Sequence, residues 1–156
     1  MNEITIIFAL ILLNGLFSMA EIALVSSRKA RLEGQANRGD KKAKEALELA
    51  EKPDTFLSTV QIGITLIGIL TGIYSGENLK SNLVAQLQQI PSLEHYSSGL
   101  ATAIIVISIT YFSLVLGELV PKRLGLSRPE TIAKYMARPM RLISVATYPF
   151  IWLLTK

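Results

Sequence analysis

The chain has 156 residues, half of them hydrophobic and only 18% charged, with a formal net charge of +4 and a mean hydropathy of +0.41. Soluble domains of this length are usually less apolar and more charged. The absence of cysteine excludes disulfides, thiolate metal sites and a cysteine nucleophile, and the single histidine, His95, excludes a histidine metal cluster. Any metal site must therefore use oxygen ligands, which hard cations prefer.

The first apolar segment covers residues 4–26, and Glu21 is its single charged residue. Its length matches the roughly 20 residues that a membrane-spanning helix needs, provided that Glu21 lies within or near the membrane. A signal peptide is the alternative for an N-terminal apolar run. That interpretation is disfavoured because the basic residues follow the segment instead of preceding it. We therefore expect a spanning helix here.

A charged stretch follows at residues 28–54, with eight Lys or Arg and six Asp or Glu. Gly34 and Gly39 interrupt it, and Pro53 ends it. Helix-forming residues dominate its second half. The pattern predicts a water-exposed helical hairpin or helical linker.

The second apolar segment, residues 55–76, has no charge over 22 positions and is long enough to span a membrane. Gly68 and Gly72 form a GxxxG pair, which allows another helix to approach closely, so they are the predicted helix-packing residues. The polar stretch 77–98 then predicts a short amphipathic helix on the opposite side of the membrane.

The third apolar segment, residues 99–118, leads into Pro121, which has no N–H and is predicted to break the helix and free carbonyls near residue 117. Pro129 and Pro139 bracket a short predicted helix at 130–138. The last apolar stretch, 142–155, has 14 residues and contains Pro149, so it is short for a span. We expect interfacial belt helices over about residues 130–155. A fourth spanning helix is the alternative.

The distribution of basic residues predicts the orientation in the membrane. Eight Lys or Arg follow the first segment, one follows the second, and six lie between residues 118 and 141. Positively charged loops remain cytoplasmic, so the first and third regions should be cytoplasmic and the N-terminus outside. The expected fold is an all-α integral membrane domain with three spanning helices, a cytoplasmic hairpin and a belt helix. The basic residues predict contact with anionic lipid and no nucleic-acid binding.

Polar residues recur at helical spacing within the apolar segments. The predicted stripe of the first helix contains Asn14, Ser18 and Glu21, and that of the second contains Ser58, Gln61 and Thr65, continued by Gly68 and Gly72. At 1.5 Å per residue, Ser18 and Thr65 lie roughly 9–15 Å inside the cytoplasmic face, near the expected end of the third helix at Glu118. Their oxygens would suit a hard cation such as Mg²⁺ or Na⁺.

Simpler roles exist for each of these residues. A Ser or Thr in a spanning helix often bonds its own backbone, and we prefer that interpretation for any single hydroxyl. Glu21 could reach the interface or pair with Arg28. For the whole set, an ion site is the better interpretation. Glu118 is the strongest candidate because it lies beside the predicted helix break.

Three motifs resemble the membrane domain of the CNNM/CorC family. They are GLFSMAEIAL at 15–24 followed by RL at 31–32, QIGITL at 61–66, and GELVPKR at 117–123. The resemblance covers essentially the whole chain. It implies a homodimer that exports Mg²⁺, driven by Na⁺ influx, with three spanning helices, an acidic cavity open to the cytoplasm and a juxtamembrane belt helix. Full-length members continue into a CBS module, which residues 1–156 do not contain, so we expect no ATP binding here.

The resemblance also implies a ligand set. Ser18 and Glu118 match side-chain ligands of the family, and a carbonyl near Gly125 would be a third. The second-helix Asn of the eukaryotic branch is missing, and Thr65 is the expected substitute. Glu21 is absent from that branch and would tune the site. The residues expected to line the cavity are Asn14, Glu21, Ser58, Gln61 and Pro121.

The expected function is therefore Mg²⁺ export coupled to Na⁺ influx. The alternative is a non-transporting membrane domain that senses Mg²⁺ or assembles and regulates other transporters. The sequence has no nucleophile–base pair, phosphate-binding loop or metal-histidine set, so we do not expect an enzyme.

Overall fold

The computed structural model of the protein describes residues 3–90 and 94–154, and this part of the chain is helical with no strand. The helices follow in the order α1 (Glu3–Ser26), α2 (Lys29–Asn37), α3 (Lys41–Glu51), α4 (Pro53–Tyr74), α5 (Glu77–Leu87), η1 (Glu94–Tyr96), α6 (Ser97–Leu114), η2 (Val115–Leu119), α7 (Val120–Ser127) and α8 (Pro129–Leu154). The expected all-α fold is confirmed.

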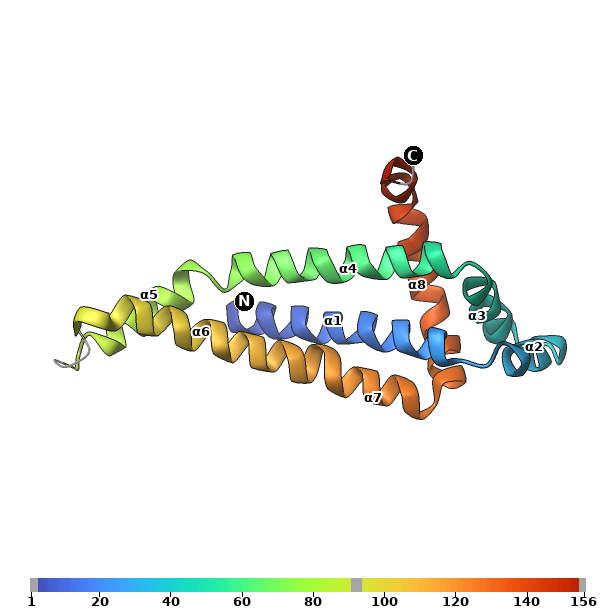
Figure 1. Ribbon diagram of the computed structural model, residues 1–156, viewed down its shortest axis with the longest axis horizontal. Coiled ribbons are helices and arrows are strands. Elements are labelled where there is room, and N and C mark those ends of the chain that lie inside the picture. Colours follow the sequence, from blue (N-terminus) through green and yellow to red (C-terminus); the bar gives the residue numbers. More distant parts are fainter. Residues whose placement is uncertain (1–2, 91–93, 155–156) are drawn as a thin grey trace.

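Three helical segments of the described chain are long and apolar enough to cross a membrane: Glu3–Ser26, Pro53–Tyr74 and Glu94–Ser127. Figure 1 shows them side by side, with α1 between α4 and the α6–α7 segment. The hairpin α2–α3 lies at one end of this layer, and α5 lies at the other. Each segment has a most apolar window of 18 residues. The buried share of that window is 39% in α1, 28% in α4 and only 6% in the third segment. The central helix α1 is therefore the most buried of the three spans.

The third span continues beyond the expected stop at residue 118. A π-helical segment, η2, connects α6 to α7, and the helix ends at Ser127. Pro121 occupies the first turn of α7, where its missing N–H and fixed φ are tolerated. The proline therefore changes the helical hydrogen-bond pattern without ending the helix.

The belt region also differs from expectation. We expected a short helix at 130–138 separate from the apolar stretch, whereas α8 is one helix from Pro129 to Leu154 that includes Pro139. Pro139 is exposed, and a carbonyl freed on that side can tilt toward water or lipid headgroups. Figure 1 shows α8 running across the long helices close to the hairpin end. The structure thus places a transverse helix where a belt was predicted.

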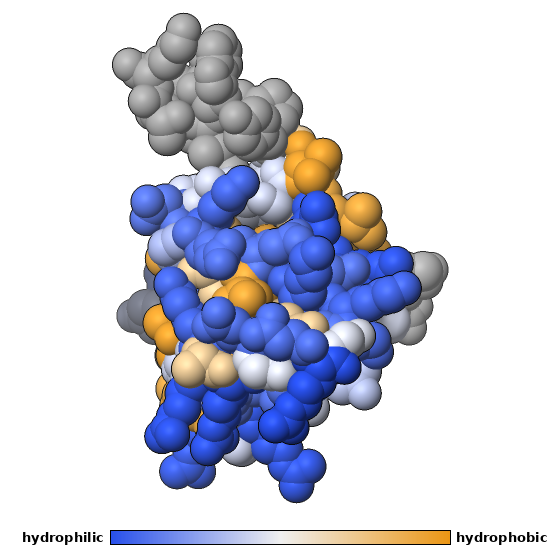
Figure 2. Space-filling model, turned by 90° about the vertical axis from the view of Figure 1, so that its right-hand side faces the viewer, coloured by the Kyte–Doolittle hydropathy of each residue, from blue (hydrophilic) through white to orange (hydrophobic). Residues whose placement is uncertain are grey.

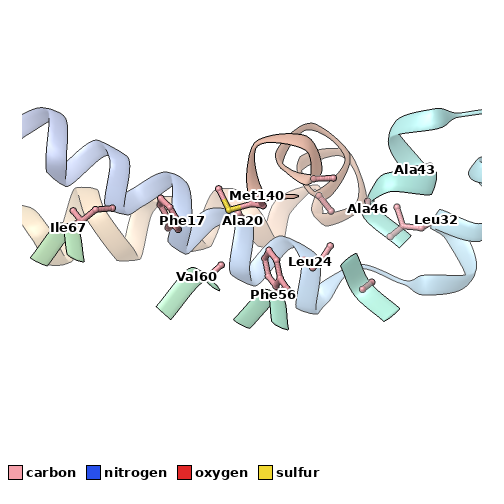
Figure 3. Close-up of a cluster of buried hydrophobic side chains, with 13 residues drawn as sticks. Phe17, Ala20, Leu24, Leu32, Ala43, Ala46, Phe56, Val60, Ile67 and Met140 are labelled. Carbon is pink, nitrogen blue, oxygen red and sulfur yellow. The ribbon is translucent and has the colours of Figure 1, made fainter. Parts of the chain in front are cut away.

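The apolar core lies where α1, α4, α8 and the hairpin meet. Figure 3 shows its buried side chains: Phe17, Ala20 and Leu24 of α1, Phe56, Val60 and Ile67 of α4, Met140 of α8, and Leu32, Ala43 and Ala46 of the hairpin. The interface of α3 with α8 consists largely of alanines, which allow the two helices to approach closely. Packing of these apolar side chains therefore holds the charged hairpin α2–α3 against the membrane-spanning helices.

The turn between α2 and α3 depends on glycine. Gly39 has φ of +93°, and the N–H groups of Gly39 and Asp40 donate to the carbonyls of Ala36 (2.9 Å) and Gln35 (3.1 Å). This is a Schellman arrangement, which a residue with a Cβ adopts only at a cost. Asp40 then caps α3 by accepting from the N–H groups of Lys42 (3.0 Å) and Ala43 (3.2 Å). The expected helical hairpin is thus formed by local sequence signals.

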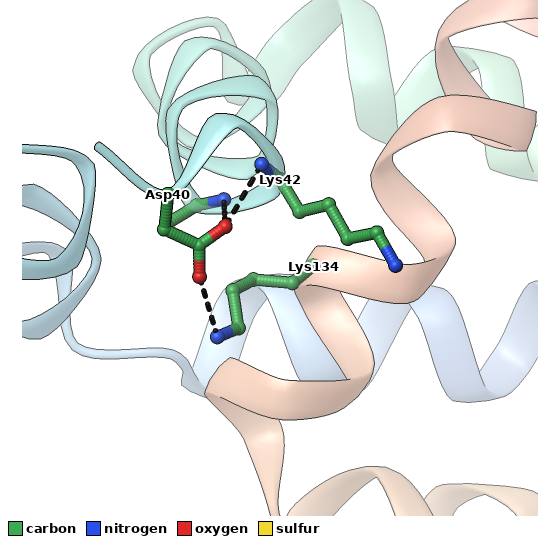
Figure 4. A network of polar contacts seen from close by, with 4 residues as sticks. Asp40, Lys42 and Lys134 are labelled. Carbon is green, nitrogen blue, oxygen red and sulfur yellow. Dashed lines mark hydrogen bonds and ion pairs between the residues drawn. The ribbon is translucent and has the colours of Figure 1, made fainter.

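Ion pairs join the hairpin to α8. They are Arg31–Glu130 (3.6 Å), Asp40–Lys134 (2.9 Å), Glu45–Arg138 (4.0 Å) and Glu48–Arg141 (3.3 Å). Figure 4 shows Asp40 bonded to Lys134 and to the start of α3. The hydrogen bond from the Lys134 ammonium, followed by that from the Ala43 N–H, lowers the pKa of Asp40. Seen end-on in Figure 2, this side of the molecule is mostly hydrophilic, as a face in water or among headgroups would be.

Candidate cation-binding groove

The π-helical segment η2 is held against the middle of α1. Pro121 cannot donate the N–H that would bond the carbonyl of Gly117 in a regular α-helix. The side-chain amide of Asn14 donates to that carbonyl instead, at 3.1 Å. Asn14 lies at the centre of α1, which extends from Glu3 to Ser26. Asn14 of the first span and the π-helical segment of the third span therefore meet at the same depth.

Close glycine contacts fix the position of η2 and α7 along α1. A Cβ on Gly15 would lie 2.8 Å from Cγ of Pro121 and 2.9 Å from the carbonyl oxygen of Leu116. A Cβ on Gly125 would lie 2.9 Å from the carbonyl oxygen of Met19. Real Cβ atoms rarely come this close, so only glycine allows the helices this separation. The segment that carries Glu118 consequently lies beside the middle of a membrane-spanning helix instead of its end.

A groove of about 380 Å³ lies between α4 and the α6–η2 segment, with α1 beside it. Its polar lining residues are Asn14, Thr71, Ser75, Thr110, Ser113 and Glu118. Its other lining residues are Ile11, Ile64, Ile67, Gly68, Gly72, Ile109 and Leu114. Glu118 is the only ionisable residue among them, so the groove offers one formal negative charge in a largely apolar setting.

Hydroxyl groups of α4 and of its C-cap residue bond to carbonyls of that helix. Thr71 donates from Oγ1 to the carbonyl of Ile67 (2.8 Å), and Ser75 donates from Oγ to the carbonyl of Gly72 (3.0 Å). This is the local role expected for single hydroxyls. A hydroxyl that donates its hydrogen in this way keeps lone pairs that can accept from a ligand or bind a cation. The two roles are therefore compatible at the groove.

The carboxylate of Glu118 has an ammonium partner on its own helix. Nζ of Lys122 lies 2.8 Å from Oε1 of Glu118, and the two side chains are 37% and 43% exposed. The i, i+4 spacing places them on one helix face. Sequence inspection missed Lys122 as a site residue because it was counted with the basic loop. The spacing alone, inside GELVPKR, could have identified the pair.

The predicted site residues do not all converge. Asn14, Glu118, Gly68 and Gly72 line the groove, and Pro121 packs beside it against Gly15. The remaining predicted residues are not among the groove lining: Ser18 and Gly125 are buried, Glu21 and Ser58 are half-buried, and Gln61 and Thr65 are exposed. The α4 face that lines the groove is rotated from the predicted stripe and shares only its two glycines.

Within the described residues, Gly68 and Gly72 do not pack against another helix. A Cβ at either position would meet no atom within 4 Å. The close helix contacts involve Gly15, Gly63, Gly117 and Gly125 instead. A Cβ on Gly63, for example, would collide with the ring of Phe17. The small residues of the predicted GxxxG pair are thus left open toward the groove.

Among the residues that the structure describes, no group of three or more His, Cys, Asp or Glu side chains is close enough to hold a metal ion. A cation in the groove would therefore be bound by Glu118 together with neutral oxygens, from hydroxyls, the Asn14 amide or the backbone. The helices and this groove define a membrane domain whose groove contains a single carboxylate, that of Glu118.

The chain belongs to the CNNM family, whose model for the cyclin M transmembrane N-terminal domain matches residues 5–156. The UPF0053 protein sll0260 of Synechocystis sp. is 53% identical over 152 residues, covering 97% of this chain and 34% of that protein. The polyamine export protein of Salmonella typhimurium is 33% identical over 153 residues, covering 98% and 34%. The UPF0053 protein YhdP of Bacillus subtilis is 30% identical over 155 residues, covering 97% and 34%. The chain thus spans about a third of these relatives.

Proposed function

We propose that this domain carries a cation across the membrane and binds it in the groove beside Glu118. The observation that carries the proposal is the position of Glu118: a π-helical segment, bonded to the middle of α1, presents the one carboxylate of the groove within the membrane-spanning layer. Ionisable residues at such a depth are costly and usually serve an ion or substrate pathway. Irregular helices that line a cavity are a recurrent feature of transporters.

The substrate we propose is Mg²⁺, exported in exchange for Na⁺. Mg²⁺ takes oxygen ligands in octahedral geometry and usually keeps several waters, so one carboxylate with hydroxyls and an amide is an adequate set. A groove of about 380 Å³ has room for a partly hydrated ion. Ser18 and Thr65 lie outside the groove in this conformation, so a site that used them would form only after α1 and α4 move relative to η2.

A polyamine is the second candidate substrate, because the polyamine export proteins are relatives at 32–33% identity. The groove also has an apolar wall formed by isoleucines and leucine beside its carboxylate. An aliphatic chain would lie against that wall while one ammonium group pairs with Glu118. The two candidates use the same carboxylate and differ in what surrounds it.

We further propose a homodimer in which the CBS module of the complete protein lies on the cytoplasmic side with the hairpin and the C-terminus, and the N-terminus faces outward. The poorly buried third span is suited to packing against a second copy. The basic and acidic residues of the hairpin and α8 suit the lipid headgroup region. The role is one of transport, not of enzymatic catalysis.

The test is flux through the complete protein reconstituted in sealed vesicles, measured separately for Mg²⁺ and for a labelled polyamine. Glu118→Gln keeps the size of the side chain and removes its charge, so we expect flux of the true substrate to fall at least about a hundredfold, as for loss of a charged contact worth roughly 3 kcal/mol. Glu51→Gln is the matched control, because Glu51 is exposed at the end of α3 and away from the groove.

The outcomes separate the hypotheses. Unchanged flux in Glu118→Gln would refute the assignment of the groove. If the vesicles transport the polyamine but not Mg²⁺, the substrate is a polyamine and the proposal of Mg²⁺ is wrong. Tight Mg²⁺ binding without any flux would favour the non-transporting sensor or assembly domain.

A further inference from the structure

Lys122 is a charged residue in the membrane-spanning layer that the cation-binding groove does not by itself explain. Pro121, its neighbour, packs against Gly15, and Gly125 packs against Met19. Lys122 therefore lies alongside the α1 segment between Gly15 and Met19, about 10–16 Å from the end of that helix at Ser26. An isolated ammonium group at this depth is unfavourable, and so is an isolated carboxylate.

The ion pair between Lys122 and Glu118 reduces the free-energy cost of placing either charge at this depth. Nζ of Lys122 is 2.8 Å from Oε1 of Glu118, so the two charges neutralise each other within one helix turn. The pair is not enclosed, because more than a third of each side chain is exposed. The ammonium group therefore occupies a position at Oε1 of Glu118 that a cation bound through this oxygen would need.

We propose that Lys122 is a tethered competitor: its ammonium group holds Glu118 in the absence of substrate and is displaced when a cation binds. This rests on the proposed binding of a cation at Glu118. An incoming Mg²⁺ or polyammonium ion repels the ammonium group while it attracts the carboxylate. The flexible four-carbon stem allows Nζ to move away toward the polar end of the helix.

The competitor has a consequence for selectivity. A monovalent ion gains about as much from Glu118 as Lys122 already does, whereas a multivalent ion gains more. At a given concentration, Lys122 therefore keeps weakly bound Na⁺ and K⁺ from this carboxylate, whereas a multivalent ion still displaces the ammonium group. Removal of Lys122 should raise the affinity for each cation by a similar factor, so that Na⁺ and K⁺ then occupy the site at lower concentrations.

Binding measurements on the complete protein in nanodiscs test the inference. We expect Lys122→Met to bind Mg²⁺ at least about fivefold more tightly than the unmodified protein, the factor that corresponds to an exposed ion pair of about 1 kcal/mol. Lys122→Arg keeps the charge and should bind as weakly as the unmodified protein. Arg123→Met is the matched control, since it removes the same charge from the adjacent, exposed residue without touching Glu118.

Unchanged or weaker Mg²⁺ binding in a folded Lys122→Met protein would overturn the inference. The Glu118→Gln variant distinguishes this failure from that of the proposed function: if it binds Mg²⁺ normally, the site itself is wrong, and the competitor with it. If Glu118→Gln loses binding while Lys122→Met gains none, only the competitor is refuted.

A measurement on the unmodified protein avoids dependence on folding of the variant. Reductive methylation labels accessible lysine amines, and mass spectrometry reports the rate at Lys122. We expect saturating Mg²⁺ to increase that rate severalfold, because the displaced amine no longer contacts the carboxylate. The rate at Lys29, at the start of α2 and exposed, should be unaffected. An unchanged rate at Lys122 would overturn the inference.

Discussion

The contact of Gly15 with Pro121 and Leu116 makes a quantitative prediction about how the first and third spans are held together. In Gly15→Ala the new Cβ would lie 2.8 Å from Cγ of Pro121 and 2.9 Å from the carbonyl oxygen of Leu116. Ordinary carbon contacts lie at about 3.5–4.0 Å. One neighbour is part of a proline ring and the other is backbone, so neither moves away as a flexible side chain would.

The cost follows from the overlap. Overpacking by one methyl group costs about 1–3 kcal/mol, and the higher helix propensity of alanine offsets up to about 1 kcal/mol. We therefore expect Gly15→Ala to be less stable by about 1–2 kcal/mol. The measurement is unfolding of the protein in mixed micelles by titration with SDS, followed by far-ultraviolet circular dichroism.

Gly34→Ala is the control for propensity alone. Gly34 lies within α2, and a Cβ there would meet no atom within 4 Å. The same substitution should stabilise the protein here by roughly 0.5–1 kcal/mol. If Gly15→Ala proved as stable as Gly34→Ala, the close packing of α1 on Pro121 would be refuted.

Two further predictions concern hydrogen bonds. Asn14→Leu keeps the branched shape and the number of side-chain heavy atoms but removes the donor to the Gly117 carbonyl. We therefore expect a loss of about 1–2 kcal/mol in the same titration. An unchanged stability would show that this bond is dispensable. Asp40, whose pKa is lowered by Lys134, stabilises the native state when ionised. That stabilisation is present above the ordinary aspartate pKa of about 4 and is lost as the pH falls through the lower native value. Unfolding profiles should show the unmodified protein more stable than Asp40→Asn at pH 7 but not at pH 2, and a difference that persists at pH 2 would contradict this account.

The sequence by itself determined that the fold is helical and, within two residues, where the first two spans begin and end. Charge-free stretches of 17 or more residues have few alternatives to spanning helices, because backbone groups in lipid must bond internally. The hairpin α2–α3 also depends on local interactions, because Gly39 supplies a positive φ and Asp40 caps the next helix. These features depend on neighbours in the chain, so patterns of neighbouring residues were sufficient to predict them.

The tertiary structure decided which polar residues face one another. Spacing placed Asn14 and Glu118 among the candidates, but it could not fix the rotation of α4 or the axial position of η2 along α1. Those depend on contacts such as that of Gly15 with Pro121, between residues more than 100 positions apart. That contact sets Glu118 beside the middle of α1. The contact of Gly63 with the ring of Phe17 holds α4 against α1, and Thr65 lies on an exposed face of α4.

Proline illustrates the same division. The sequence showed that Pro121 has no backbone N–H, and it predicted a carbonyl without its helical donor near residue 117. Only the folded chain showed that Asn14 supplies the missing donor and that the helix continues to Ser127. A local rule identifies the unsatisfied group, whereas its partner comes from a distant segment whose position is set by packing.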